Sequence, residues 1–225
     1  WLTSHFAVGG WSPLQRLSGM LTAHMTQIAP HNGFTWHPHR ALEIYTWVLE
    51  GELYHEDTTG GRGVIKAGEL QRMFAGDYIE HQELNLSGQP ARVIQIWYVA
   101  DRKYQGLQPH YQQIGQTGLP SRRMGDSTVY SLIGVDSPVE QHMTGRLTAS
   151  NVDDGGKTTL ELPQDNEDLF LYVTEGTGQL TLNGETRPLG QYDVIVARPD
   201  AVAATIQGDQ SLRYLSFYLP PFLIA

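Results

Sequence analysis

The sequence of 225 residues contains no cysteine. Disulfides, cysteine-ligated zinc, iron–sulfur clusters and thiol catalysis are therefore excluded, and any metal must be held by histidine, carboxylates and water. No apolar run approaches the roughly 20 residues that a membrane-spanning helix needs, so we do not expect a membrane protein. The lack of cysteine also fits a reducing compartment, and we expect a cytoplasmic location.

Positive charge is scarce as well. Fifteen lysines and arginines stand against 24 acidic residues, which gives a formal net charge of −9, and the basic residues form no cluster. Because nucleic-acid binding depends on such clusters, we expect no direct contact with nucleic acid.

Long helical patterns are also missing. Short segments rich in aromatic and β-branched residues are separated by glycine and proline, which predicts an all-β fold. Residues Trp1–Pro13 are interpreted as an irregular lead-in. The clearest predicted strands and hairpins lie at Phe34–His39, Glu43–Leu49, Glu52–Ile65 and Val93–Val99.

Two β-rich halves are predicted. Between Asp101 and about Asp126 the pattern weakens into glutamine, glycine, proline and arginine, which indicates a connection between them. We therefore expect an N-terminal domain over residues 1–125, with the metal site, and a C-terminal domain over residues 126–225, without metal ligands.

Two pairs of ligand-type residues occur in the first half, His37 with His39 and His81 with Glu83. Residues two apart in a strand point to the same face. If the two strands face each other, three imidazoles and one carboxylate surround a common point. This arrangement predicts a mononuclear metal site with positions left for water or substrate.

An internal repeat supports this interpretation. The segment Val48–Gly51 aligns with Val173–Gly176, and a second match of turns places Ala203 opposite His81 and Thr205 opposite Glu83. No histidine follows His142. Because the second copy has the pattern without the ligands, the ligand set is not needed for the fold.

The first half also carries a set of motifs in a fixed order. They are His37-Pro38-His39-Arg40, Glu43, Val48-Leu49-Glu50-Gly51, His55-x-Asp57, Ala67-Gly68-Glu69, Ala75-Gly76, His81-x-Glu83 and Gln95-Ile96-Trp97, with Leu219-Pro220-Pro221 at the end of the chain. In these residues the chain resembles the pirin family of bicupins, particularly the bacterial pirin-like quercetin 2,3-dioxygenases. The resemblance implies two tandem cupin (jelly-roll) β-barrels.

The resemblance further implies that His37, His39, His81 and Glu83 ligate one divalent transition metal. We expect iron, with nickel, copper, manganese, cobalt and zinc as alternatives, because the ligand set does not select among them. The implied reaction opens the ring of a flavonol with O₂ and releases carbon monoxide, with Glu83 as the general base. The expected partners are a small aromatic substrate and O₂, and the expected state is a monomer.

Other residues near these motifs have two interpretations. We predict that a substrate pocket is lined by Met73, Phe74, Tyr78, Ile79 and Trp97. The alternative is that these side chains fill the barrel. Glu43 is expected to pair with a histidine or arginine rather than with the metal. His24 and His55 are expected to be structural histidines with satisfied hydrogen bonds.

Two other functions stay open at this point. The resemblance also covers non-catalytic, metal-containing regulators that respond to the redox state of iron, and cupin enzymes with another small aromatic substrate. A deep pocket lined by aromatic residues would favour an enzyme. A closed site with every metal position filled by protein would favour the regulator.

Overall fold

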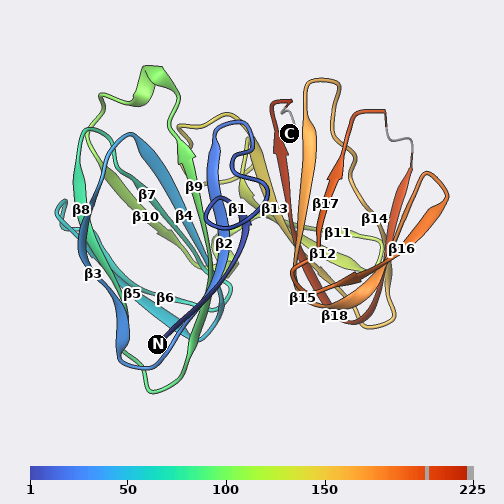
Figure 1. Cartoon of the computed structure of the whole chain (residues 1–225), viewed down its shortest axis with the longest axis horizontal. Coiled ribbons are helices and arrows are strands. Elements are labelled where there is room, and N and C mark those ends of the chain that lie inside the picture. The colour runs from blue at the N-terminus through green and yellow to red at the C-terminus, as the bar shows by residue number, and fades with distance from the viewer. Residues whose placement is uncertain (201–202, 222–225) are drawn as a thin grey trace. The chain divides into compact units, whose positions relative to one another are not determined.

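A computed structural model describes residues 1–200 and 203–221, and these residues are almost entirely β-strands and turns (Figure 1). Within this part of the chain the helical segments are two short 3₁₀ turns, Arg102–Tyr104 and Gln116–Gly118. No helix that it contains is long and apolar enough to cross a membrane. The all-β prediction is confirmed.

The chain divides into two compact units. The first comprises Trp1–Gly118 and Val139–Met143, and the second comprises Leu119–Pro138 and the described residues from Thr144 onward. The domain boundary expected at residues 125 and 126 stays a prediction. Residues 201, 202 and 222–225 of the expected second domain lie outside the described residues.

The first unit consists of two antiparallel sheets (Figure 1). In order across the sheet, the larger contains β1 (Leu2–Val8), β2 (Met20–Ile28), β9 (Ala91–Val99), β4 (Leu42–Glu50), β7 (Leu70–Phe74) and β10 (His110–Ile114). The smaller contains β3 (Asn32–His39), β8 (Ile79–Asn85), β5 (Glu52–Asp57) and β6 (Arg62–Lys66).

Alternation in two central strands decides which side chains enter this unit. In β8, Ile79, His81 and Glu83 are buried while the residues between them are partly exposed. In β5, His55 and Asp57 are buried in the same alternating way. Since successive residues of a strand point to opposite faces, four ionisable side chains share the interior of the first unit.

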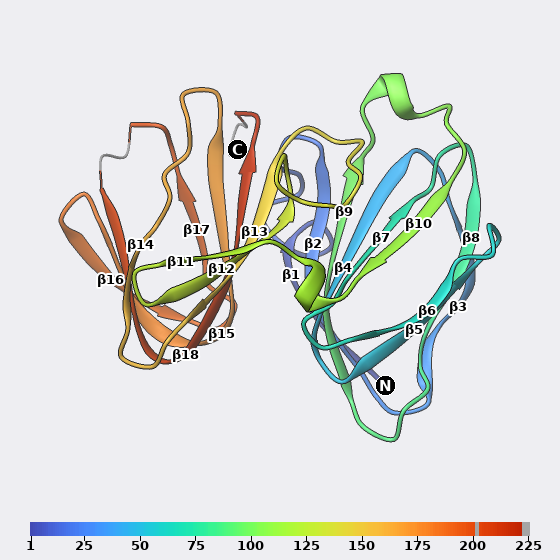
Figure 2. The same cartoon turned by 180° about the vertical axis from the view of Figure 1, so that it is seen from behind.

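Two segments that were not predicted to contain strands do contain them, although the boundary between the two units does lie in the second of these segments. The lead-in at Trp1–Pro13 contains β1, which pairs with β2 along its length. The predicted connection after Asp101 contains β10, which pairs with β7 at the edge of the larger sheet (Figure 2), and β11 (Ser121–Met124). Partly exposed edge strands do not show the apolar alternation on which the prediction relied.

The second unit is built around one sheet of long strands. Its order is β11, β12 (Ser127–Ile133), β13 (Arg146–Val152), β18 (Ala204–Leu219), β15 (Asp168–Leu182) and β16 (Glu185–Gly190), with β14 (Lys157–Thr159) beside β18 and β17 (Val194–Ala197) beside β15. Its core is apolar and includes Leu169, Leu171, Val173 and Ile206.

Strand pairing corrects the register of the internal repeat. Asp57 pairs with His81 in the first unit, and Leu182 pairs with Ala204 in the second. Ala204 and Ile206, rather than Ala203 and Thr205, therefore take the places of His81 and Glu83. Both replacements are buried and apolar, so the described part of the second copy offers no ligand at these places.

Candidate metal centre

His37 and His39 lie on β3, at the edge of the smaller sheet. This position accommodates Pro38, which has no N–H to donate to a neighbouring strand. Between Phe34 and His37 the strand carries an irregularity, since Phe34 pairs with Glu83 but His37 pairs with His81. One extra residue therefore stands on β3, and such bulges redirect side chains next to sites.

The structure brings three of the predicted ligands together. One nitrogen of each of His37, His39 and His81 lies within 4.8 Å of the other two. The ring centroids are 5.0 Å apart for His37 and His39, 4.3 Å for His37 and His81, and 4.9 Å for His39 and His81. We call these three residues the histidine cluster.

The hydrogen bonds of the histidine cluster fit a metal ion. Nε2 of His39 and Nε2 of His81 are buried without a hydrogen-bond partner. Nδ1 of His37 lies 2.8 Å from the carbonyl oxygen of Thr35, which accepts its proton and leaves Nε2 as the free lone pair. Buried polar atoms rarely stay unpaired, and a cation between the rings would satisfy them.

Burial also favours the neutral form of His39 and His81, as metal ligation requires. It lowers the pKa of His39 to about 4, with a further lowering by His37 and an opposing effect of Glu83. It lowers the pKa of His81 to about 2, with further lowering by the other nearby histidines and an opposing effect of Asp57. At neutral pH the rings of His39 and His81 therefore each have a lone pair available.

Glu83 lies on the same face of β8 as His81 and is held by neutral donors. Nε2 of Gln95 donates to its two carboxylate oxygens at 3.0 and 2.8 Å, and the Thr46 hydroxyl lies 3.5 Å from Oε1. The spacing of 4.8 Å that defines the histidine cluster does not include Glu83. That carboxylate instead forms a second group at the same spacing with His55 and His81.

An apolar cavity of about 530 Å³ opens beside these residues. His37, Glu83, Gln95 and Trp97 belong to its wall. Most of the remaining wall comes from β1 and β2 and from Phe34, and it comprises Leu2, Ser4, Phe6, Gly10, Leu21, Thr22, His24, Thr26 and Phe34. The volume lies within the range of about 300–1,000 Å³ that is usual for small-molecule sites.

The five residues expected to line a substrate pocket are divided between the cavity wall, the interior and the surface, although Trp97 also packs against the core cluster that contains Met73 and Ile79. Trp97 lines the cavity. Met73 and Ile79 are fully buried in a core cluster with Ile44 and Ala75. Phe74 is also fully buried, against the ring of His142, and Tyr78 is 39% exposed beside Arg40. For Met73, Phe74 and Ile79 the structure agrees with the alternative that they fill the barrel.

The cavity wall contains residues that sequence reasoning missed, above all Phe6, His24 and Phe34. Phe6 lies in the segment that was interpreted as an irregular lead-in. His24 was interpreted as structural, and its Nδ1 does lie 2.8 Å from the Thr26 hydroxyl. The sequence signal that could have identified this face of β2 was the alternating polar series Thr22, His24 and Thr26. Such residues fit neither an exposed face nor an apolar core, and here they line the cavity.

Glu43 pairs with an arginine, as expected. Nε of Arg72 donates to Oε1 of Glu43 at 2.7 Å, and the backbone N–H of His142 donates to Oε2 at 2.7 Å. Burial raises the pKa of Glu43, against an opposing effect of Arg72. With both carboxylate oxygens occupied in this way, Glu43 is not a candidate ligand.

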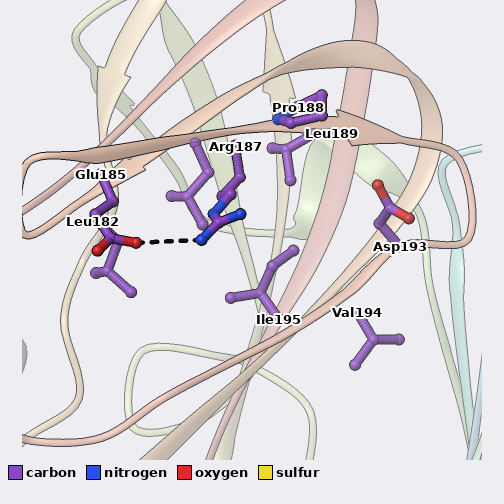
Figure 3. Close-up of a pocket in the computed structure, with 9 residues that line it drawn as sticks. Leu182, Glu185, Arg187, Pro188, Leu189, Asp193, Val194 and Ile195 are labelled. Atoms are coloured by element: carbon purple, nitrogen blue, oxygen red, sulfur yellow. Dashed lines mark hydrogen bonds and ion pairs between the residues drawn. The ribbon is translucent and has the colours of Figure 1, made fainter.

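The second unit has a smaller cavity of about 300 Å³, formed by β15, β16 and β17 (Figure 3). Its wall includes Leu180, Leu182, Leu189 and Ile195, and it has an exposed ion pair of Arg187 with Glu185. This cavity contains no histidine. Its wall therefore lacks the donor set of the first unit.

Comparison with known proteins decides the family. The sequence profile of the Pirin family matches residues 13–98, and the profile of the AraC-like ligand binding domain matches residues 166–225. A Mycobacterium tuberculosis protein named "Putative quercetin 2,3-dioxygenase" is 37% identical over 161 residues, which are 70% of this chain and 63% of that protein. Residues 13–98 belong to the Pirin family.

Further relatives of this pirin agree with that placement. "Pirin-like protein 2" of Arabidopsis thaliana is 26% identical over 198 residues, or 85% of this chain and 61% of that protein. The chain thus spans less than two thirds of the length of these two relatives. A bacterial pirin of Escherichia coli, solved in complex with nickel(II), superposes with a TM-score of 0.79 at 25% identity and covers 98% of this chain and 93% of its own.

These likenesses confirm the predicted fold class of two cupin domains for this pirin. Together with the unpartnered nitrogens, the cluster could hold one metal ion in the first unit.

Proposed function

We propose that this pirin is a metal-dependent dioxygenase that opens the central ring of a flavonol such as quercetin with O₂ and releases carbon monoxide. The observation that carries the proposal is the shared wall of the cavity. Metal-type donors, His37 and Glu83, lie on it together with the flat rings of Phe34 and Trp97. A planar aromatic substrate can therefore reach the metal position from an apolar chamber.

His37, His39 and His81 would hold the ion, with Glu83 as the fourth ligand. A bound divalent ion would supply a Lewis acid that lowers the pKa of a substrate hydroxyl. One nitrogen of each histidine lies within 4.8 Å of the other two, and His37 and Glu83 also line the cavity, so an ion held by the cluster would lie beside this cavity. This open side favours an enzyme over a regulator whose metal positions are all filled by protein.

Glu83 would accept the proton of the flavonol 3-hydroxyl as general base. Gln95 donates hydrogen bonds to the carboxylate but keeps its own protons. Because each carboxylate oxygen has a further lone pair, Glu83 can still accept a proton from the substrate. The apolar wall excludes water and holds the substrate rings, which keeps the hydroxyl near the carboxylate. The residues thus divide into those that hold the ion, those that hold the rings and one that takes the proton.

The first test is O₂-dependent loss of quercetin absorbance by protein reconstituted with Fe(II), Ni(II) or Mn(II), with metal content measured on the same samples. We expect about one ion per chain, because the wall of the second cavity contains no histidine. His37→Ala should abolish both binding and turnover. His31→Asn, which removes an exposed histidine on a turn, serves as the matched control.

Each result bears on a separate part of the proposal. Glu83→Gln should retain most of the metal and lose turnover, and full activity in that variant would reject Glu83 as the base. One bound ion without quercetin turnover would reject the flavonol substrate. A wild-type protein that binds no metal would reject the metal centre itself.

A further inference from the structure

His55 contacts the histidine cluster without belonging to the cavity wall. Its side chain is fully buried, and its Nδ1 lies 3.5 Å from Nδ1 of His81. Its Nε2 lies 2.9 Å from Oδ2 of Asp57, whose side chain is also buried. Asp57, His55 and His81 thus form a chain of contacts that ends at an unpartnered Nε2 in the metal position.

We propose that Asp57 and His55 are positioning residues that keep the proton of His81 on Nδ1 and its Nε2 lone pair toward the metal. This inference rests on the proposed metal centre. His55 and Asp57 on β5 would then select the tautomer of His81 on the neighbouring strand β8.

Asp57 is fixed as an acceptor by the hairpin that follows β5. Its Oδ1 accepts from the backbone N–H of Thr59 at 2.8 Å, the Thr59 hydroxyl at 2.6 Å and the backbone N–H of Gly61 at 3.1 Å. These donors occupy one oxygen and leave Oδ2 for His55. Since a carboxylate held in this way only accepts, Nε2 of His55 must carry a proton.

The remaining nitrogen of His55 is then an acceptor. Nε2 of the Gln71 side chain lies 3.2 Å from Nδ1 of His55 and donates to it. The ring is also held in orientation, because it stacks on Tyr111 with centroids 4.6 Å apart and an angle of 13° between the planes. A neutral His55 therefore presents Nδ1 as a lone pair to the Nδ1–H of His81.

This arrangement also explains why His55 is not a ligand itself, although it lies near His81 and Glu83. Its two nitrogens are engaged, one with Asp57 and one with Gln71 and His81. The unpartnered nitrogens belong instead to His39 and His81. The tautomer of His81 thus depends on a partner that stays outside the coordination sphere.

The second unit offers an internal comparison. The repeat that aligns Val48–Gly51 with Val173–Gly176 places Leu180 at the position of His55 and Leu182 at that of Asp57. Strand pairing agrees, since Leu182 faces Ala204 as Asp57 faces His81. Both leucines line the cavity of the second unit that Figure 3 shows. The second unit, which has no histidine at the corresponding places, therefore also lacks counterparts of His55 and Asp57.

The test compares four variants of the full chain with wild type. Asp57→Asn keeps the shape of the side chain but turns an N–H₂ toward His55, so His55 should move its proton to Nδ1 and His81 its proton to Nε2. His55→Leu copies the second unit, and His55→Gln retains both a donor and an acceptor. His31→Asn is the control. Ni(II) affinity is measured by competition with a chelator, and imidazole tautomers by ¹⁵N NMR on metal-free protein.

We expect the proton of His81 on Nδ1 in wild type and on Nε2 in Asp57→Asn, with Ni(II) affinity reduced about 10- to 100-fold. His55→Leu should weaken binding in the same range, and His55→Gln should restore it to within about threefold of wild type. A purely structural role would lower stability without moving the proton.

Two results would overturn the proposal. One is a wild-type His81 with its proton on Nε2, and the other is Asp57→Asn protein with wild-type affinity and tautomer. If His55→Leu does not fold, the tautomer of His81 in wild type and in Asp57→Asn still tests the proposal. If wild-type protein binds no Ni(II), the metal centre fails, whereas the tautomers of the metal-free protein still show whether Asp57 and His55 direct the proton of His81.

Discussion

The amide of Gln95 donates to both carboxylate oxygens of Glu83, and its carbonyl oxygen accepts from Nε1 of Trp97 at 2.8 Å. The indole N–H can only donate, so it determines which end of the amide faces Glu83. A residue of the cavity wall thereby orients the amide that holds the proposed base. The three side chains form one hydrogen-bonded series from β9 to β8.

We expect Gln95→Leu to lower kcat on quercetin by about 10- to 100-fold while metal content stays near one ion per chain. The leucine removes both hydrogen bonds that Nε2 of Gln95 donates to Glu83, so the carboxylate is less firmly oriented toward the substrate hydroxyl. Steady-state rates and metal analysis on the same preparation provide the measurement. Gln27→Leu, at an exposed position of the adjacent strand β2, is the matched control. An unchanged kcat in Gln95→Leu would contradict the role of this amide.

The buried pair of Arg72 and Glu43 gives a prediction about stability. Both side chains are fully buried, and Nη2 of Arg72 lies 2.6 Å from Oε1 of Glu43. Arg72→Met leaves the carboxylate without its counter-charge, so we expect the free energy of unfolding to fall by about 3–5 kcal/mol. Urea unfolding of the metal-free protein measures this change.

A second variant separates charge from packing at the same site. Arg72→Met combined with Glu43→Gln should recover part of the loss, because no buried charge is then left alone. Arg187→Met removes an arginine from the exposed pair with Glu185 and should leave the urea midpoint unchanged. Equal losses in the single and the double variant would show that shape, rather than charge, matters at Arg72.

His24 predicts a dependence of stability on pH. Burial lowers its pKa from 6.5 to about 4, with an opposing effect of Glu83. The unfolded chain therefore binds the proton more readily than the folded one, and stability falls as the pH is lowered from about 6.5 to about 4. This single group accounts for a loss of about 3 kcal/mol at most over that window.

The comparison of wild type with His24→Gln isolates this contribution from those of His39 and His81, which act in the same direction. Metal-free protein is unfolded with urea at pH 7 and at pH 4.5. We expect the variant to lose less stability between these two values than wild type does. Parallel losses in both proteins would mean that His24 is protonated equally in the folded and unfolded states.

The sequence alone was enough for the fold class and for the two pairs of ligand-type residues, whereas the pairing of β3 with β8 brought the three histidines together. Alternation is a local property of a strand, so His37 with His39, and His81 with Glu83, could be placed on shared faces before any contact was known. The repeat without ligand-type residues at the corresponding places indicated that the fold does not need these side chains, and strand pairing then corrected its register by one residue. Glu43 could likewise be assigned to a pair with an arginine or histidine.

Only the tertiary structure decided which residues surround the site. The cavity wall comes from β1 and β2, and the first of these is an edge strand without a clear pattern, so Phe6 could not be foreseen. Met73 and Ile79 alternate like wall residues but point into the core cluster. The role of His55 depends on a contact across two strands with His81 and on the hairpin that fixes Asp57. Strand periodicity shows to which face of a strand a side chain points. Its neighbours depend on how strands pair and sheets pack, which involves residues far apart in the sequence.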